Sequence, residues 1–166
     1  MKTEPMNSEA YWDERFSTDW DENQGPAQTR FFAALAIGHL PPWLESDIRV
    51  HGLSVVDFGC ATGDAVPMLA RHLGVPVSGV DVSAQALNRA RQRFPGHAFH
   101  QIHDVALPEE VDVLFTSNTL EHFHDPQQTL SALLPRVRKY AVVLVPFQEP
   151  EESRLDEHFV SFDFHN

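Results

Sequence analysis

The sequence has very little cysteine and no long hydrophobic segment. Its 166 residues include one cysteine, Cys60, so no disulfide can form within the chain. No apolar run is long enough to span a bilayer, and residues 1–5 are polar, without the apolar core of a signal peptide. These absences predict a cytoplasmic protein that does not enter a membrane.

Basic residues are also scarce. Lysine and arginine together number 12 against 24 acidic residues, which gives a formal net charge of −12. A protein that holds nucleic acid needs basic side chains to replace the counterions of the phosphates. We therefore expect no nucleic-acid partner. The ten histidines are scattered and no Cys/His group has the spacing of a zinc site, so we expect no metal either.

What the sequence does contain is a glycine-rich turn after a buried strand. The apolar run 53–58 is typical of a strand covered on both faces. Gly59 and Gly63 let the backbone turn sharply and approach a ligand closely. Asp64 is predicted to cap the following helix with its carboxylate, and Pro67 still fits the first helical turn. Such a turn can cradle a small molecule.

The details of this turn favour a cationic ligand. Ala61 stands where a dinucleotide fingerprint requires its second glycine, and the acid Asp57 precedes the turn. A carboxylate there repels phosphates. The pattern Asp-x-Gly-x-Ala-x-Gly resembles motif I of the class I S-adenosylmethionine (SAM)-dependent methyltransferases, which usually carry glycine at the Ala61 position.

Two further acids follow later strands. Asp81 ends the apolar segment 75–83, about twenty residues beyond the turn, as ribose-binding acids of nucleotide-binding units do. Asp104 follows a short predicted strand at 98–102, and the resemblance places it against the adenine amino group. Ser83 is predicted to cap a helix over 84–93.

A fourth predicted strand, 111–116, runs into the segment 117–126, which contains Leu-Glu-His and then Asp-Pro. The carboxylate of Asp125 is predicted to cap a helix that starts at Pro126. This segment resembles the one after strand four of small-molecule and lipid-quinone methyltransferases. We predict that His122 is a general base for the methyl acceptor and that Glu121 holds its ring or contacts the amino-acid end of SAM. A His122 that merely bonds to backbone at a helix entry is an equal alternative.

The alternation of strands and helices predicts an α/β fold, a Rossmann-like doubly wound and mostly parallel sheet in a single domain. We divide the chain into an N-terminal helical lid region (1–40), a SAM-binding core (41–148) and a tail (149–166). The family's sheet has seven strands, and we expect the last two to be lacking after a fifth strand at 140–145. The tail, a second copy or a partner chain is then expected to cover the edge of that strand.

The N-terminal region holds a predicted helix at 26–39, whose large apolar residues, Phe31 and Leu35 among them, are expected to pack on the sheet. Before it, Tyr11 is the leading candidate to close over the ligand. The resemblance implies SAM as cofactor and S-adenosylhomocysteine (SAH) as product. The residues predicted to contact the cofactor come from every segment described above: Tyr11, Asp57, Gly59, Cys60, Ala61, Gly63, Asp81, Val82, Asp104, Val105 and Asn118.

The expected function is methyl transfer from SAM to a small molecule by in-line displacement. The segment 157–163 resembles the stretch after strand five in methyltransferases associated with bacterial polysaccharides, which favours a hydroxyl of a sugar, glycan or related metabolite. Two alternatives stay open. One is a SAM-binding but inactive partner or regulatory subunit. The other, a nicotinamide-dependent oxidoreductase, is disfavoured by Ala61.

Overall fold

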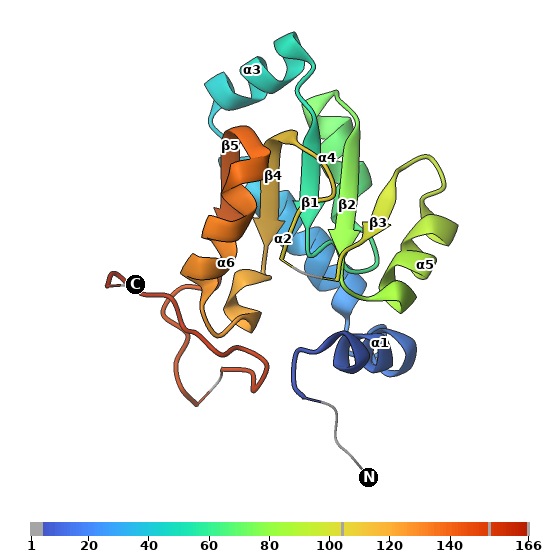
Figure 1. Ribbon diagram of the computed structural model, residues 1–166, viewed down its shortest axis with the longest axis vertical. Coiled ribbons are helices and arrows are strands. Elements are labelled where there is room, and N and C mark those ends of the chain that lie inside the picture. Colours follow the sequence, from blue (N-terminus) through green and yellow to red (C-terminus); the bar gives the residue numbers. More distant parts are fainter. Residues whose placement is uncertain (1–4, 104, 153, 166) are drawn as a thin grey trace.

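The computed structural model describes residues 5–103, 105–152 and 154–165. At its centre is a five-stranded sheet with the order β3-β2-β1-β4-β5 (Figure 1). Every neighbouring pair is parallel. Strands β2 and β3 follow β1 on one side, and β4 and β5 follow on its other side, so the strand order reverses between β1 and β4. The strands are β1 (Val55–Phe58), β2 (Val77–Asp81), β3 (Phe99–Gln101), β4 (Val111–Ser117) and β5 (Val137–Leu144). The predicted fold class is confirmed, although β5 begins three residues earlier than expected.

Helices cover both faces of this sheet. The helices are α1 (Glu9–Thr18), α2 (Gly25–His39), α3 (Pro42–His51), α4 (Ala65–Leu73), α5 (Ala84–Arg93) and α6 (Pro126–Leu133), with short 3₁₀ turns η1 (Leu120–His122) and η2 (Leu134–Arg136). In Figure 1, α6 lies in front of the sheet, and α2 and α4 lie behind it. The ligand crevice of such a sheet lies beyond the carboxyl ends of β1 and β4, where the strand order reverses.

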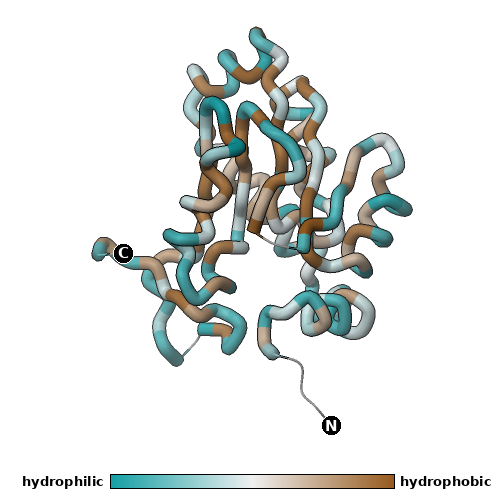
Figure 2. Tube along the Cα trace, in the orientation of Figure 1, coloured by the Kyte–Doolittle hydropathy of each residue, from teal (hydrophilic) through white to brown (hydrophobic). Residues whose placement is uncertain are grey.

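Burial on both faces explains why the strands are apolar at successive positions. Val55 and Val113 pack toward α2 and α4, whereas Val56, Val80 and Leu114 pack into a second cluster with residues of α6. Figure 2 shows this apolar centre, with polar residues gathered on the outer helices. A strand buried on both faces loses the alternation of a half-exposed one, as the run 53–58 indicated.

Two of the three predicted helix caps are present. The Ser83 hydroxyl accepts a hydrogen bond from the Ala86 amide at 3.0 Å, and the Asp125 carboxylate accepts one from the Gln128 amide at 2.8 Å. Pro126 is the first residue of α6, where its missing amide hydrogen costs nothing. These caps fix the starts of α5 and α6, the helices that follow β2 and β4.

The third predicted cap, Asp64, is absent, so this prediction was wrong. Asp64 makes no capping hydrogen bond to α4, although it is almost completely buried. Its carboxylate instead accepts hydrogen bonds from Arg93 at 2.7 Å and from Arg30 at 2.8 Å. Two guanidinium groups compete better for a buried carboxylate than a backbone amide does, because charged partners make the stronger hydrogen bonds. Asp64 therefore ties α2 and α5 to the glycine-rich turn.

The apolar face of α2 is also different from the expected one. Phe31 is 62% exposed and Leu35 is 38% exposed, whereas Ala33 and Ala36 are buried. Helix α2 packs on α4 through these alanines, since small side chains let two helices approach closely. The prediction for the large residues was therefore wrong for Phe31 and Leu35.

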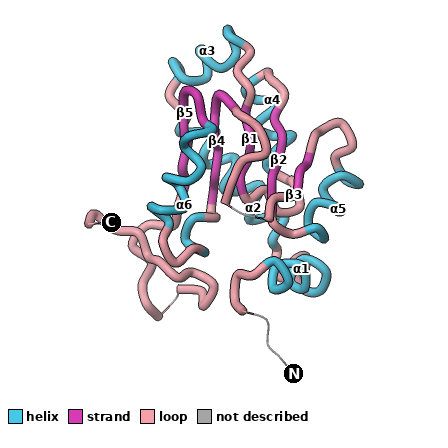
Figure 3. The backbone as a smooth tube through the Cα atoms, in the orientation of Figure 1, coloured by secondary structure: helices cyan, strands magenta, loops and turns pink. Residues whose placement is uncertain are grey.

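Both ends of the described chain lie at the carboxyl side of the sheet, where α1 and the tail flank the strand ends (Figures 1 and 3). Within the described residues, β5 pairs with β4 alone, and Val143 is 39% exposed. The tail does not extend the sheet there; it makes one isolated bridge, between Phe147 and Phe162. No helix in the described residues is both long and apolar enough to cross a membrane.

Candidate active site

A cavity of about 440 Å³ opens at the carboxyl ends of β1, β2 and β4. Its walls come from the glycine-rich turn, η1, helices α1 and α2, and the tail. Eight of the residues predicted from the sequence line it: Asp57, Gly59, Ala61, Asp81, Val82, Asn118, Glu121 and His122. The sheet thus brings together residues that lie up to 65 positions apart in the chain.

Three other predicted residues, Cys60, Gly63 and Val105, lie near this cavity. Cys60 is buried against Gly79 of β2, and Gly63 faces Phe99 of β3. Val105 lines a smaller neighbouring cavity of about 270 Å³, together with Val82. Asp104, the predicted adenine contact, lies outside the described residues.

The glycine-rich turn has the backbone that its sequence demands. Gly59 and Gly63 both have φ of +77°, and a Cβ on Gly59 would lie 2.4 Å from the Thr119 side chain. Ala61 also adopts a positive φ, +48°, which a residue with a Cβ adopts at some cost. The left-handed backbone at Ala61 gives a physical reason for the glycine that the family usually carries there.

Asp81 holds the turn in place. One carboxylate oxygen accepts a hydrogen bond from the Ala61 amide at 2.8 Å, and the other accepts one from the Ser83 amide at 2.9 Å. Each oxygen keeps a second lone pair, so the same carboxylate can still accept hydrogen bonds from a ligand's hydroxyls. Burial raises the pKa of Asp81 to about 6, although these backbone hydrogen bonds oppose the rise.

Asp57 lies beside Asp81, at the end of β1. Asp57 is only 3% exposed. Burial, and then the neighbouring charge of Asp81, raise the pKa of Asp57 to about 7. Two buried carboxylates side by side create a negative field, which a cationic ligand would relieve.

At the other end of the cavity, Glu121 of η1 is completely buried. Neither of its carboxylate oxygens has a hydrogen-bond partner among the described residues. Burial raises the pKa of Glu121 to about 7. Polar contacts with the backbone at Glu121 and Thr119 oppose this rise, and the nearby charge of Glu149 adds to it.

His122, the predicted base, is next to Glu121 and packs edge-on against Trp12, with ring centroids 5.0 Å apart. Its Nδ1 lies 3.0 Å from the Glu157 carbonyl oxygen and must donate to it, because a carbonyl only accepts. Its Nε2 is then the atom that could accept a proton. Burial lowers the pKa of His122 to about 4, so the ring is neutral near pH 7 but only weakly basic. Both readings of this histidine, base and backbone-bonded residue, remain compatible with this geometry.

The tail contributes residues that the sequence analysis did not assign to the site. Glu157 is 8% exposed, accepts a hydrogen bond from the Tyr11 hydroxyl, and pairs with Arg15 Nε at 3.0 Å. Asn7 donates to the backbone carbonyls of both Glu157 and His122. The tail is therefore clasped to α1 and η1 and forms one wall of the cavity.

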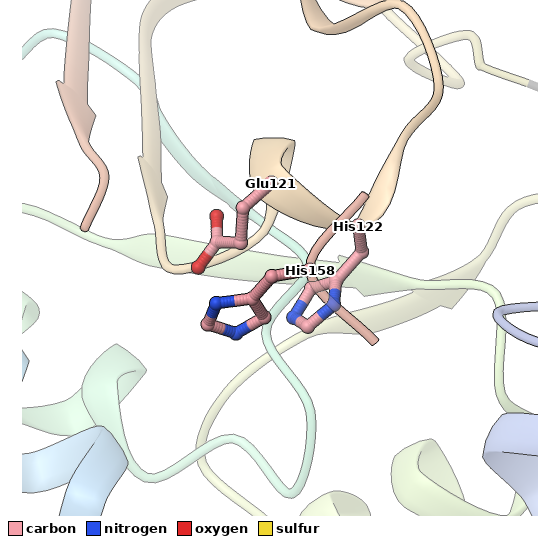
Figure 4. A group of neighbouring side chains, drawn as sticks. All are labelled: Glu121, His122 and His158. Carbon is pink, nitrogen blue, oxygen red and sulfur yellow. The ribbon is translucent and has the colours of Figure 1, made fainter. Parts of the chain in front are cut away.

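His158 follows Glu157 and also lines the cavity. Its Nδ1 lies 2.9 Å from both carboxylate oxygens of Glu149. Figure 4 shows the side chains of Glu121, His122 and His158 close together, and all three line the cavity. One sequence signal could have found His158: it belongs to the tail segment used above for the family resemblance, but its 36-residue distance from His122 hid the grouping.

Two aromatic residues of α1, together with Trp20 in the turn after it, form the roof of the cavity. Trp12 stacks on Phe16 at 5.7 Å, Phe16 contacts Trp20 at 4.7 Å, and all three line the cavity. Trp20 also donates from Nε1 to the Thr62 hydroxyl in the turn, at 3.2 Å. Tyr11, the leading lid candidate, does not line the cavity and instead holds the tail. Its prediction as a cofactor contact stays untested.

Comparisons with known proteins identify a family for this chain. The family model described as a methyltransferase domain matches residues 56–143, more than half of the chain. A trans-aconitate 2-methyltransferase of Rhodopseudomonas palustris (strain BisA53) is 36% identical over 101 residues, 56% of this chain and 37% of that protein. A ubiquinone biosynthesis O-methyltransferase of Cupriavidus pinatubonensis is 32% identical over 134 residues, 76% of this chain and 52% of the relative. The match thus spans about half or less of each relative's length.

Among solved structures, the SAH-bound magnesium protoporphyrin IX methyltransferase of Synechocystis PCC 6803 superposes with a TM-score of 0.60 at 20% identity. The superposition covers 78% of this chain and 66% of that one, and it supports the fold. The family match, the strand order and the turn after β1 lead to one conclusion. The chain belongs to the methyltransferase-domain family of class I SAM-dependent methyltransferases.

Proposed function

We propose that this protein transfers the methyl group of SAM to a small molecule. The observation that carries the proposal is a single cavity that joins the family's cofactor turn, at Gly59 and Asp81, to the polar segment after β4, at Glu121 and His122. A cofactor held by the turn would direct its methyl group toward that segment. In-line displacement needs mainly such proximity and alignment, because a sulfonium is already a good leaving group.

The charges of the cavity support a neutral acceptor. Its described lining includes five carboxylates, Asp57, Asp81, Glu121, Glu149 and Glu157, and one arginine, Arg15, which is already paired. Such a field attracts the cationic cofactor and repels an anionic acceptor. We propose a hydroxyl of a sugar, glycan or related metabolite as the methylated group, by the tail resemblance together with this charge balance.

The test has two stages. Calorimetry with SAM, SAH and NAD measures cofactor choice, and we expect SAM and SAH to bind at one per chain and NAD not to bind. Release of SAH in the presence of neutral hydroxyl, amine and carboxylate acceptors then measures activity, and we expect the hydroxyl class to be methylated. SAM binding without turnover on any acceptor class would instead favour the SAM-binding inactive partner or regulatory subunit.

We also propose that a second copy or a partner chain covers the free edge of β5. The exposed Val143 supports it, as does the outer edge of β5, which pairs with no further strand in the described residues. Light scattering over a range of protein concentrations tests the homo-oligomer, and a monomer at every concentration would argue against a second copy.

A further inference from the structure

We propose that Glu121, His122 and His158 bind a divalent transition-metal cation, of the class of Zn²⁺ or Mn²⁺, at the acceptor end of the cavity. Each residue offers one ligand atom, and these atoms all lie within 4.8 Å of one another. Two of the residues come from η1 and the third from the tail (Figure 4). All three line the cavity, so an ion there would face the ligand space.

The Glu121 carboxylate supplies an independent reason. It is completely buried, and both of its oxygens lack a hydrogen-bond partner among the described residues. A buried and unpaired carboxylate is costly, so such groups are normally paired or bound to a metal. The nearby Glu149 adds a second negative charge instead of a compensating positive one. The cluster is therefore short of positive charge, which a divalent cation would supply.

Both imidazoles have an outer hydrogen-bond partner, as metal-binding histidines commonly do. The Nδ1 atom of His122 donates to a backbone carbonyl at 3.0 Å, and Nδ1 of His158 meets the Glu149 carboxylate at 2.9 Å. In each ring these partners direct the hydrogen to Nδ1 and leave the lone pair on Nε2. Outer partners of this kind fix the tautomer and orientation of metal-binding histidines and make the ligand more basic.

The donor set selects among ions. Zinc lies about 2.0–2.2 Å from nitrogen and carboxylate ligands, which puts ligand atoms roughly 3–4 Å apart. Closing the observed cluster on an ion thus needs movements of about an ångström, within the reach of side-chain torsions. Two imidazoles and one carboxylate suit Zn²⁺, Mn²⁺ or Fe²⁺ better than Mg²⁺ or Ca²⁺, which prefer oxygen ligands alone. Three protein ligands leave a position open for a further ligand.

A catalytic consequence follows if the proposed function holds. The acceptor hydroxyl would occupy the open position, where the cation lowers its pKa. The hydroxyl proton passes to solvent, and the oxygen's electron pair forms the new bond to the methyl carbon. The carbon–sulfur bond breaks, and its electron pair stays on sulfur, which gives SAH. Binding of the ion itself rests on the geometry alone and does not require this step.

The direct test is metal titration of tag-free protein stripped with a chelator. Calorimetry with Zn²⁺, Mn²⁺ and Mg²⁺ in separate runs gives stoichiometry and affinity, and elemental analysis counts the bound ion. We expect one Zn²⁺ or Mn²⁺ per chain, with Mg²⁺ at least about tenfold weaker. A wild-type protein that binds no stoichiometric ion would overturn the proposal.

Matched variants locate the ion. Glu149→Gln should weaken binding about 10- to 100-fold, the usual effect of losing an outer partner, and His158→Ala should weaken it further. His51→Ala is the control, because it removes an exposed imidazole on α3, at the opposite end of the sheet. Equal affinity in His158→Ala and His51→Ala would place the ion elsewhere and overturn the proposal.

Glu121→Gln separates the two possible partners of the buried carboxylate. We expect this variant to lose metal affinity and to keep its SAM affinity, which also reports that the protein is folded. Loss of SAM affinity with unchanged metal affinity would assign Glu121 to the cofactor and overturn the proposal. Stoichiometric metal binding without methyl transfer would contradict the proposed function but leave the metal site standing.

Discussion

The two ends of the cavity are built in different ways. The end that we propose for the cofactor consists of strand ends and one turn. Its shape is held by contacts to the backbone: the Asp81 carboxylate accepts from the amides of Ala61 and Ser83, and the Gly59 backbone lies against the Thr119 side chain. The acceptor end is assembled from side chains of η1 and the tail, such as His122 and Glu157. The first end is local and backbone-defined, whereas the second depends on contacts between distant segments.

This difference has a functional meaning. A cofactor shared by a whole family needs a site of constant shape, which backbone geometry provides. An acceptor that differs between members needs a wall that can vary, and loops and tails positioned by a rigid scaffold provide it. We therefore expect substitutions at the two ends to have separable effects, on SAM affinity at one end and on turnover at the other.

The largest expected effect is at the acceptor end. Replacing His122 with asparagine should lower turnover by about 10²–10⁴, because it removes either a general base or a metal ligand. SAM affinity should change by less than about twofold, which is well under 1.4 kcal/mol of binding free energy. Single-turnover kinetics with saturating acceptor measures the first quantity and calorimetry the second. Equal losses in both would show that the two ends are one unit.

The matching change at the cofactor end is Asp81→Asn. It should weaken SAM binding by roughly 2–4 kcal/mol, since the ribose loses a charged acceptor and the Ala61 amide a stronger partner. Asp112→Asn, at the amino end of β4, is the control. Calorimetry should show the loss for Asp81 alone, and an affinity within a factor of about two of wild type would remove the ribose assignment.

A glycine pair tests how far the backbone defines the turn. A Cβ on Gly63 would lie 2.7 Å from the Phe99 ring, whereas one on Gly52 meets nothing within 4 Å, and both have a positive φ. Gly63→Ala should cost about 2–4 kcal/mol of unfolding free energy, from overpacking and backbone strain together. Gly52→Ala should cost about 1–2 kcal/mol, from backbone strain alone. Denaturant unfolding compares them, and equal costs would mean that the turn relaxes easily.

Weakening the contact between α1 and the tail should have a smaller effect than these changes. Tyr11→Phe removes one hydrogen bond to Glu157, while Arg15 stays paired with that carboxylate. The free energy of unfolding should therefore fall by about 1 kcal/mol. The phenol pKa of about 12, raised by burial and by Glu157, keeps Tyr11 a donor at ordinary pH. We expect a higher KM for the acceptor and an unchanged SAM affinity. A change in SAM affinity alone would make Tyr11 a cofactor contact, as the sequence suggested.

A pH dependence is also expected at the cofactor end, with opposite trends in stability and affinity. Asp57 and Asp81 have pKa values raised to about 7 and about 6, so the folded protein binds protons that the unfolded chain has already lost. Stability of the ligand-free protein should therefore fall as pH rises from about 4 to about 7. SAM affinity should move the opposite way, rising by up to about tenfold as the carboxylates ionise. Thermal unfolding from pH 5 to 8, with and without SAM, measures both trends, and parallel curves would contradict the assignment.

The sequence was sufficient to predict the fold, and most of the residues predicted to contact the cofactor line one cavity. An apolar run leads to Asp57 and another to Asp81. Each run predicts a buried strand, and the acid predicts a polar ligand contact within a few residues of it. Where local signals compete with long-range partners, the prediction was wrong. The position of Asp64 before a helix predicted a cap. The two arginines that bind it instead are about 30 residues away on either side, so the local sequence does not indicate them. The helical spacing of Phe31 predicted that it would be in the core, but α2 packs through the smaller alanines and leaves Phe31 exposed.

The acceptor end was only half predictable for the same reason. Glu121 and His122 belong to a recognisable segment, but nothing local indicates that His158 and Glu157 fold back onto it. That contact depends on the backbone of Phe159 donating to the Glu121 carbonyl at 2.8 Å, and on the bridge between Phe147 and Phe162. Such pairings between loops leave no periodic pattern in a sequence.

A calorimetric titration of the wild-type protein with SAM, repeated in the presence of excess NAD, tests the central claim most directly. The claim is that the turn from Gly59 to Gly63, together with Asp57 and Asp81, forms a site for a cationic methyl donor. It predicts one SAM bound per chain and an affinity that NAD does not alter. Absence of SAM binding, or displacement of SAM by NAD, would contradict it.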